Sequence, residues 1–308
     1  MRQRTAGLLW EWTAFTRWLE VKFRRACSFV QPDNSRRRMP VRNMLALIPM
    51  NSSPETITTA AVAPRFALLA CSVFEREIEL HGRGASHIAE TRFFEMGLHD
   101  RPAQLRATLQ QNLDAVDART DIEAVVLAYG LCGRGTAGLR PLRHKLVIPR
   151  AHDCITVFLG SKEAYAERQR CCPTCYYYTP GWNRGRRVPG PEQVAARRAE
   201  YAQKFAPEEV EFLLETERCQ FALNDTATYL DLGTEDAEAE AAYAKQCAGW
   251  LGWKFERLPG DPSLLLDLLW GKWDAERFQI VEPGKRLNHA PDETILRAEP
   301  AEDQPVSH

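Results

Sequence analysis

Residues 124–165 read AVVLAYGLCGRGTAGLRPLRHKLVIPRAHDCITVFLGSKEAY, and the rest of the chain is interpreted outward from this stretch. It contains two short apolar runs rich in β-branched residues, Ala124 to Ala128 and Lys145 to Ile148, which predict two buried strands. Each run leads into a loop that carries a cysteine, Cys132 in the first loop and Cys154 in the second. The stretch therefore predicts two strands with a thiol at the end of each.

The two loops have different compositions. The first, YGLCGRGTAG, is rich in glycine, so its backbone can adopt left-handed conformations and approach a ligand closely. The second places His152, Asp153 and Cys154 directly before ITVFLGSKEAYAER, which predicts a helix with Asp153 or Cys154 in its first turn. A thiol at that position is expected to be biased toward the thiolate by the helix dipole.

A third cysteine, Cys71, ends the earlier apolar run RFALLACSVF in the same way. Strands and helices alternate from Arg65 onward, with one helix predicted over 102–117. This alternation predicts an α/β fold with a mainly parallel sheet and helices on both faces. Parallel strands end at one edge of a sheet, where open α/β sheets bind ligands, so Cys71, Cys132 and Cys154 are expected to converge there.

Three converging thiols predict a metal site. Three thiolates could hold an iron–sulfur cluster, [4Fe–4S], with one iron open to substrate. They could also hold zinc, with His152 or Asp153 as the fourth ligand, because soft thiolates favour both. We favour the cluster because its open position suits chemistry on a bound substrate. The structural alternative is that each cysteine is a small buried apolar side chain.

Charged residues near these loops are candidates for the remaining roles. His152 and Asp153 adjoin Cys154 and are candidate acid–base groups, with an exposed histidine and a helix-capping aspartate as the structural alternative. Arg134 and Arg150 are candidate ligands for a substrate carboxylate or phosphate, with solvated surface arginines as the alternative.

Residues 169–191, QRCCPTCYYYTPGWNRGRRVPGP, predict a loop outside the sheet. The single C-x₂-C pair, Cys172 and Cys175, with Cys171 beside it, is a weak signal for zinc, and a redox pair is the other reading. The tyrosines 176–178 and Trp182 predict a lid or packing loop. Beyond it, a helix from 191 to 217 is expected to be divided at Pro207.

Composition limits the functional classes. At 308 residues, with 44% hydrophobic and 26% charged residues, the chain has the composition of a soluble globular protein. Its net charge of -1 gives no reason to expect a nucleic-acid partner or an acidic membrane surface. Nine irregularly spaced cysteines indicate thiols or metal ligands better than a secreted disulfide framework, which favours the cytoplasm. The sequence contains no run of eighteen apolar residues, so it predicts no membrane span.

The chain is expected to divide into three parts. Residues 1–64 predict a helical or disordered leader and linker outside the core, and Met39, Met44 and Met50 are alternative starts. Residues 65–287 are expected to form the α/β domain that carries the three-cysteine site. Residues 288–308 predict a disordered tail.

Four segments together resemble the domain-of-unknown-function family 1638 over about residues 66–287: YGLCGRGTAGL, VIPRAHDCITVFLGSKEAY, YYYTPGW and DPSLLLDLLWGKWDAERFQIVEPG. The resemblance implies a pattern that includes Cys71, Cys132 and Cys154 but not the insertion with Cys171, Cys172 and Cys175. It transfers no activity. It implies a genomic association with corrinoid-dependent methyltransferases, and hence one-carbon metabolism and a protein partner in a methyltransferase pathway.

No phosphate-binding P-loop, dinucleotide fingerprint or G-x-S-x-G elbow occurs in the sequence. The expected function is a metal- or iron–sulfur-dependent enzyme that acts on a small anionic molecule. The alternative is a metal-binding accessory or carrier protein without catalysis of its own.

Overall fold

The structure, a computed structural model, describes residues 65–301, which lie within one compact unit of the chain. Its larger sheet has five strands in the order β2-β1-β3-β4-β8. The first four strands run parallel and β8 pairs with β4 in the antiparallel direction. The strands are β1 (Phe66–Cys71), β2 (Ile88–Phe94), β3 (Ala124–Ala128), β4 (Lys145–Pro149) and β8 (Phe278–Val281).

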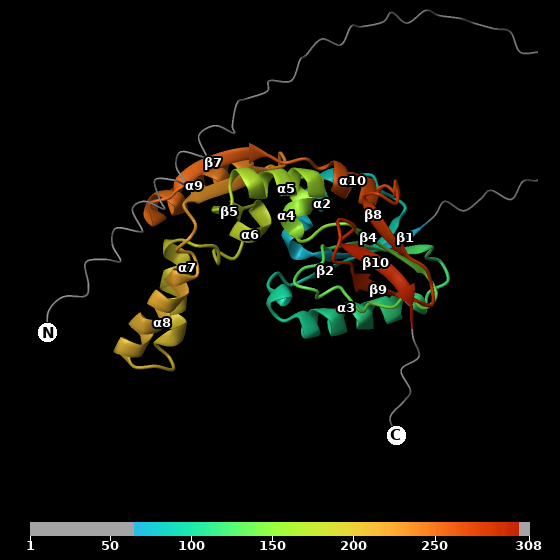
Figure 1. Ribbon diagram of the computed structural model, residues 1–308, viewed down its shortest axis with the longest axis horizontal. Helices are drawn as coiled ribbons and strands as arrows, with labels where there is room; N and C mark the ends of the chain where they lie inside the picture. The colour runs from blue at the N-terminus through green and yellow to red at the C-terminus, as the bar shows by residue number, and fades with distance from the viewer. Residues whose placement is uncertain (1–64, 302–308) are drawn as a thin grey trace, which may run out of the picture. The chain divides into compact units, whose positions relative to one another are not determined.

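Helices cover both faces of this sheet, and the predicted α/β class is confirmed (Figure 1). On one side α3 (Pro102–Asp117) has proline in its first turn and buries Leu105, Leu109, Leu113 and Val116, which share one helical face. On the other side α10 (Ser263–Leu269) packs on β3, β4 and α4 (Cys154–Phe158). The remaining elements around this sheet are η1 (Ser72–Phe74), α2 (Glu75–His81) and η2 (Leu98–Asp100).

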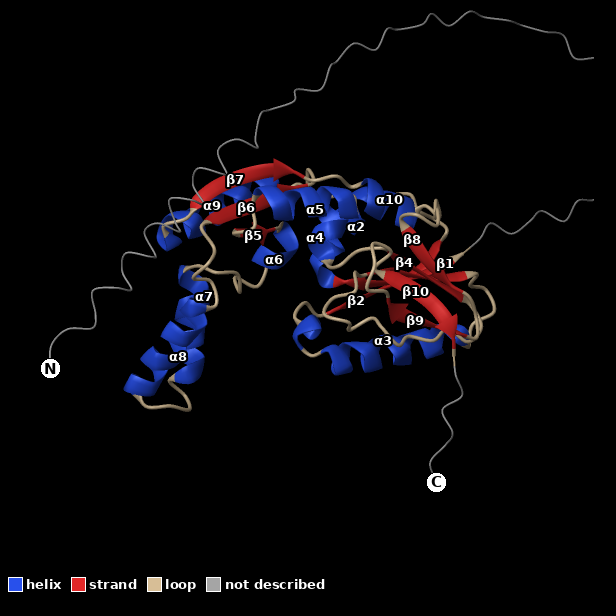
Figure 2. Ribbon diagram, in the orientation of Figure 1, coloured by secondary structure: helices blue, strands red, loops and turns tan. Residues whose placement is uncertain are grey.

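A second parallel sheet follows in the chain, with three strands in the order β5-β6-β7 (Figure 2). Its strands are β5 (Cys175–Tyr178), β6 (Thr226–Asp231) and β7 (Lys254–Pro259), and α9 (Ala237–Leu251) packs on β6 and β7. The other helices of this region are α5 (Lys162–Cys171), α6 (Pro180–Asn183), α7 (Pro191–Tyr201) and α8 (Pro207–Cys219). The expected division of the long helix near Pro207 is confirmed, since α8 begins there.

The prediction that residues 169–191 lie outside any sheet was wrong for β5. Tyr177 and Tyr178 are buried, and Cys175 to Tyr178 pair in parallel with Thr226 to Tyr229 of β6. The high content of cysteine and proline around this segment suggested a loop. The partner strand, some fifty residues further along the chain, provides the hydrogen bonds and the apolar surface that make it a strand.

The predicted disordered tail also needs correction. A hairpin of β9 (Lys285–His289) and β10 (Leu296–Pro300) continues the fold to residue 301. Leu287, Ile295 and Leu296 are buried in the core of the larger sheet. Apolar burial therefore stabilises a segment whose local composition is polar. Residues 302–308 and the predicted leader, 1–64, with its alternative starts, lie outside the described residues.

Within residues 65–301, no helix is long and apolar enough to span a membrane.

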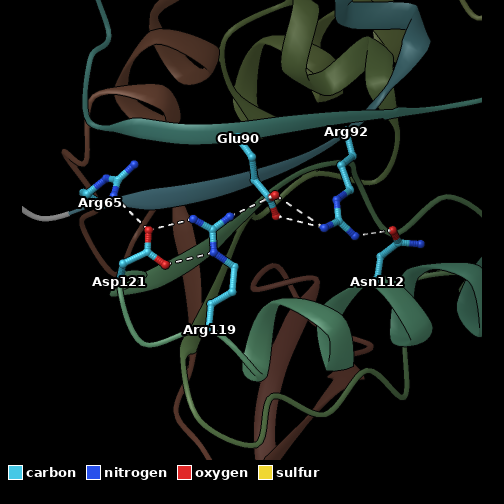
Figure 3. Close-up of polar contacts among 6 residues, drawn as sticks. All are labelled: Arg65, Glu90, Arg92, Asn112, Arg119 and Asp121. Atoms are coloured by element: carbon cyan, nitrogen blue, oxygen red, sulfur yellow. Dashed lines mark hydrogen bonds and ion pairs between the residues drawn. The ribbon is translucent and has the colours of Figure 1, made fainter.

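A network of ion pairs lies near the amino ends of β1 and β3 (Figure 3). Asp121 accepts from Arg65 and Arg119, with nitrogen–oxygen distances of 2.8 and 2.7 Å. Arg119 and Arg92 also reach Glu90 on β2, at 3.0 and 3.2 Å. Each carboxylate in this cluster has arginine partners. These ion pairs join the chain segments at the edge of the sheet opposite to the cysteines.

Candidate functional site

The three cysteines predicted as ligands lie at the carboxyl ends of three neighbouring strands. Cys71 is the last residue of β1, Cys132 lies in the loop after β3, and Cys154 is the first residue of α4 after β4. Their thiols are close enough to act on one another electrostatically. The Cys71 thiol raises the pKa of Cys132, and the thiols of Cys132 and Cys71 raise the pKa of Cys154. The structure thus brings the three together.

The loops that carry Cys132 and Cys154 are joined backbone to backbone. The N–H groups of Leu131 and Cys132 donate to the carbonyls of Ala151 and His152, at 2.8 and 2.9 Å. Gly130 makes this approach possible, because a Cβ atom there would lie 2.7 Å from the Asp153 nitrogen. The glycine predicted to allow close approach to a ligand allows close approach of a second loop.

Cys132 adopts a left-handed backbone conformation, with φ of 45°, and Gly133 and Arg134 follow with 62° and 68°. A non-glycine residue in this region costs about 1 kcal/mol or more and persists only where the surroundings hold it. Here the hydrogen bond to His152 holds the backbone. The backbone at Cys132 is therefore held in a strained conformation, as is common at functional sites.

Burial raises the pKa of all three thiols, to about 12 for Cys132 and well above the ordinary value for Cys154. The prediction that the helix dipole would bias Cys154 toward the thiolate was wrong. Its helix, α4, spans only Cys154–Phe158, and burial together with the neighbouring Asp153 carboxylate outweighs the dipole. Each of the three thiols therefore gives up its proton less readily than an exposed cysteine does.

Among the described residues, no group of three or more His, Cys, Asp or Glu side chains stands in an arrangement that could hold a metal ion. Metal binding at the three cysteines would therefore require side-chain rearrangement and the release of the thiol protons.

Asp153 is a helix-capping residue and His152 is exposed, as in the structural alternative given above. Asp153 caps α4, because its carboxylate accepts from the Thr156 backbone N–H at 3.1 Å and from the Thr156 hydroxyl at 3.2 Å. Its other oxygen accepts from the Tyr165 hydroxyl at 3.2 Å. His152 is exposed, and its ring centre lies 5.7 Å from that of Tyr165.

The two arginines predicted to bind substrate have different surroundings. Arg134 is exposed within the Cys132 loop. The Arg150 guanidinium donates to the carbonyls of Ala275, Thr294 and Leu296 and to the Gln279 side chain. These bonds join the end of β4 to β8 and to the β9–β10 hairpin, which gives Arg150 a structural role. Arg150 also lines a cavity of about 150 Å³, so its role in substrate binding stays a prediction.

A cavity of about 340 Å³ opens beside the three cysteine loops. The lining residues lie outside these loops, but each loop has a lining residue as a neighbour. The Met96 N–H donates at 3.1 Å to Ser72, the residue after Cys71. Gly133, the residue after Cys132, packs near the carbonyl of His99. Burial, the Cys154 thiol and the Asp100 carboxyl raise the pKa of Tyr176 to about 12. The cavity walls include Met96, His99, Asp100, Tyr176, Trp182, Arg187, Arg197 and Phe221.

Sequence reasoning missed most of this cavity. The predicted lid or packing loop, YYYTPGW, does supply Tyr176 and Trp182. Arg187, Arg197 and Phe221 come from segments with no local motif, so only the second sheet and its helices reveal them.

The comparison with protein families matches residues 93–269, more than half of the 308-residue chain, to a protein of unknown function family, DUF1638. The chain belongs to the DUF1638 family. The DUF1638 match includes Cys132 and Cys154 and begins after Cys71, so it is narrower than the resemblance over 66–287. The search of curated proteins and the search of solved structures each found no match. DUF1638 membership thus places the chain in a family without supplying an activity.

The Cys-rich segment 169–191 carries a disulfide between Cys172 and Cys175, which lie at the turn between α5 and β5. Cys171, at the end of α5, donates to Glu167 at 3.0 Å. In residues 65–301 of this DUF1638 chain, the cysteines outside the three loops and the disulfide are Cys171, Cys219 and Cys247, and the disulfide is separate from the three-cysteine loops.

Proposed function

We propose that this chain is a metal- or iron–sulfur-dependent enzyme that acts on a small anionic molecule, with Cys71, Cys132 and Cys154 as the metal ligands. The observation that carries the proposal is the position of three coupled thiols at one edge of a parallel sheet, with their loops near residues that line a cavity. Three thiolates suit a [4Fe–4S] cluster or zinc, and either group supplies a Lewis acid.

The cluster remains the favoured group because Asp153 and His152, the two candidates for a fourth zinc ligand, already have other contacts. Both oxygens of Asp153 already accept hydrogen bonds, from Thr156 and Tyr165. The His152 ring lies against Tyr165. A site with three protein ligands leaves one coordination position for substrate. In this proposal exposed His152 exchanges protons with substrate, and Asp153 positions Tyr165 and α4.

The cavity suits the proposed substrate. Its volume of about 340 Å³ lies in the range of small-molecule sites. Tyr176, Trp182 and Phe221 supply aromatic surface, and Arg187 and Arg197 supply positive charge for a carboxylate or phosphate. Arg197 also contacts Glu200 at 3.0 Å, so an anionic ligand would compete with that ion pair. Arg134 is a third candidate from the Cys132 loop.

The alternative is a metal-binding accessory or carrier protein without catalysis of its own, although the burial that raises the pKa of the Cys132 and Cys154 thiols counts against it. A carrier must release its metal to a partner, which needs ligands near the surface. In either role we place the chain in the cytoplasm, with a partner in a methyltransferase pathway in one-carbon or corrinoid-linked metabolism.

Replacing Cys71, Cys132 or Cys154 by serine should remove the metal from protein purified without oxygen. Changes in the groups that merely orient a ligand lower metal affinity about 10- to 100-fold, so loss of a ligand itself should cost at least about 100-fold. Iron, sulfide and zinc analysis with a visible spectrum measures the effect and identifies the metal.

Two variants provide controls. Cys247→Ser changes a buried cysteine in α9, which packs on the second sheet, and His152→Ala changes an exposed residue beside Cys154. Both should retain the metal of the native protein. Wild-type protein without iron or zinc, or three serine variants with full metal content, would disprove the proposed metal site.

A further inference from the structure

We propose that Cys172 and Cys175 form a redox-active disulfide that accepts electrons from a protein dithiol. The two residues stand in the sequence Cys-Pro-Thr-Cys and form a disulfide across the turn between α5 and β5. This site is separate from the three-cysteine site and does not depend on the proposed metal.

The surroundings of the Cys175 sulfur favour its thiolate. The Arg168 guanidinium and the Thr228 hydroxyl both contact this sulfur, each at 3.3 Å. A disulfide sulfur is a weak acceptor, whereas a thiolate is a charged acceptor that forms much stronger hydrogen bonds with these groups. Both donors therefore stabilise the reduced pair more than the disulfide, which makes the disulfide a better oxidant.

Glu256 keeps the two donors in place. Its carboxylate accepts from Arg168 at 2.6 Å and from the Thr228 hydroxyl at 3.0 Å. The hydroxyl has one hydrogen, which either Glu256 or Cys175 can receive. Arg168 has several donors and can serve both, so it is the main source of thiolate stabilisation.

A structural role explains the pair less well. A disulfide between residues only three apart closes a very short loop, so it constrains the unfolded chain less than a bridge across a long loop. Both cysteines are partly exposed and the Pro173 between them is exposed, so a thiol reagent can reach the turn. These features are typical of exchanging disulfides rather than of structural ones.

The exchange follows from this asymmetry. The thiolate of the dithiol attacks the Cys172 sulfur and forms a mixed disulfide, while the Cys172–Cys175 bond breaks and Cys175 leaves as the thiolate beside Arg168. The second thiol of the dithiol then attacks the first sulfur of the same dithiol, which is bonded to Cys172 in the mixed disulfide, and Cys172 is released. Two electrons and two protons pass to the pair, and the reductant becomes a disulfide.

The test equilibrates the full chain with mixtures of reduced and oxidised glutathione. Thiols are then trapped with N-ethylmaleimide, and the peptide carrying Cys172 and Cys175 is quantified by mass spectrometry. We expect both thiols to appear together at a measurable midpoint. The midpoint is expressed as the square of the reduced glutathione concentration divided by the oxidised glutathione concentration. Arg168→Met should raise this quantity by about tenfold, because one hydrogen bond to a charged group is lost.

Arg257→Met is the matched control, because this neighbour of Glu256 on β7 pairs with Asp231 and Glu238 instead. It should leave the midpoint unchanged. Thr228→Val tests the second donor, should shift the midpoint in the same direction by less, and replaces Arg168→Met if that variant does not fold. A pair that glutathione reduces only after unfolding, a pair isolated as thiols that no glutathione mixture oxidises, or equal midpoints in the donor variants and Arg257→Met would overturn the proposal.

Discussion

Replacing Gly130 by alanine is expected to separate the two cysteine loops and to destabilise the fold by about 2 to 3 kcal/mol, the upper part of the range for overpacking. The added Cβ would lie 2.7 Å from the Asp153 nitrogen and 2.8 Å from its Cα. These are backbone atoms, so no side chain can rotate away. The loops must move apart, and this weakens the hydrogen bonds from Leu131 and Cys132 to Ala151 and His152.

The same change should also affect the proposed metal site. Cys132 and Cys154 lie on the two loops that Gly130 holds together, so Gly130→Ala should lower metal content although all three thiols remain. Urea unfolding and metal analysis of one preparation measure both effects.

Gly249→Ala is a suitable control for this change. Gly249 lies in α9, where an added Cβ would meet no atom within 4 Å. It should be neutral or stabilise the protein by up to about 1 kcal/mol through helix propensity. Equal stability of Gly130→Ala and the wild type would mean that the loops are not packed as described.

Replacing Glu77 by glutamine is expected to stabilise the protein above pH 7 by up to about 3 kcal/mol, at about 1.4 kcal/mol per pKa unit. Glu77 lies on α2 and is fully buried, and neither carboxylate oxygen accepts a hydrogen bond from another residue among residues 65–301. Burial, assisted by the Asp236 carboxylate, raises its pKa to about 7 against the influence of its own backbone N–H and of Arg184 and Arg76.

The sign of the pH dependence follows from the proton balance. The folded protein keeps a proton on Glu77 up to about pH 7, whereas the unfolded chain loses it near pH 4.5. The folded state thus binds more protons between these values, so stability falls as the pH rises from 4.5 to 7 and the loss is complete above 7. Glutamine cannot ionise, which removes this loss.

Urea unfolding at several pH values between 5 and 8.5 tests the prediction. The difference between Glu77→Gln and the wild type should be small at pH 5 and largest above pH 7. Glu79→Gln, an exposed position on the same helix, should show no such trend. If the wild type and Glu77→Gln give parallel stability curves across this range, Glu77 does not titrate as described.

The amino-acid sequence by itself determined the parts of the fold whose burial follows a local repeat. The runs at Ala124 to Ala128 and Lys145 to Ile148 match β3 and β4, and the predicted helix over 102–117 matches α3. Strand–helix alternation predicted a mainly parallel sheet, although no helix separates β3 from β4, and the parallel direction placed Cys71, Cys132 and Cys154 at one edge. These features follow because a periodic pattern and a crossover connection act over short distances in the chain.

Other features were decided by contacts between distant segments. Cys175 to Tyr178 became β5 because β6 pairs with it, and Leu287 and Leu296 were buried because the hairpin packs on the larger sheet. The Arg150 guanidinium donates hydrogen bonds to carbonyls that lie more than a hundred residues away in the chain.

The chemistry at the site depended most on the tertiary structure. Local sequence predicted a lowered pKa for Cys154 from its helix position, but the packed fold raised that pKa by burial. The cavity near the three cysteine loops has walls from the regions of both sheets, from Met96 to Phe221. Residue order specifies which groups stand at strand ends. The desolvation and the charges that set their reactivity come from side chains that only folding brings near.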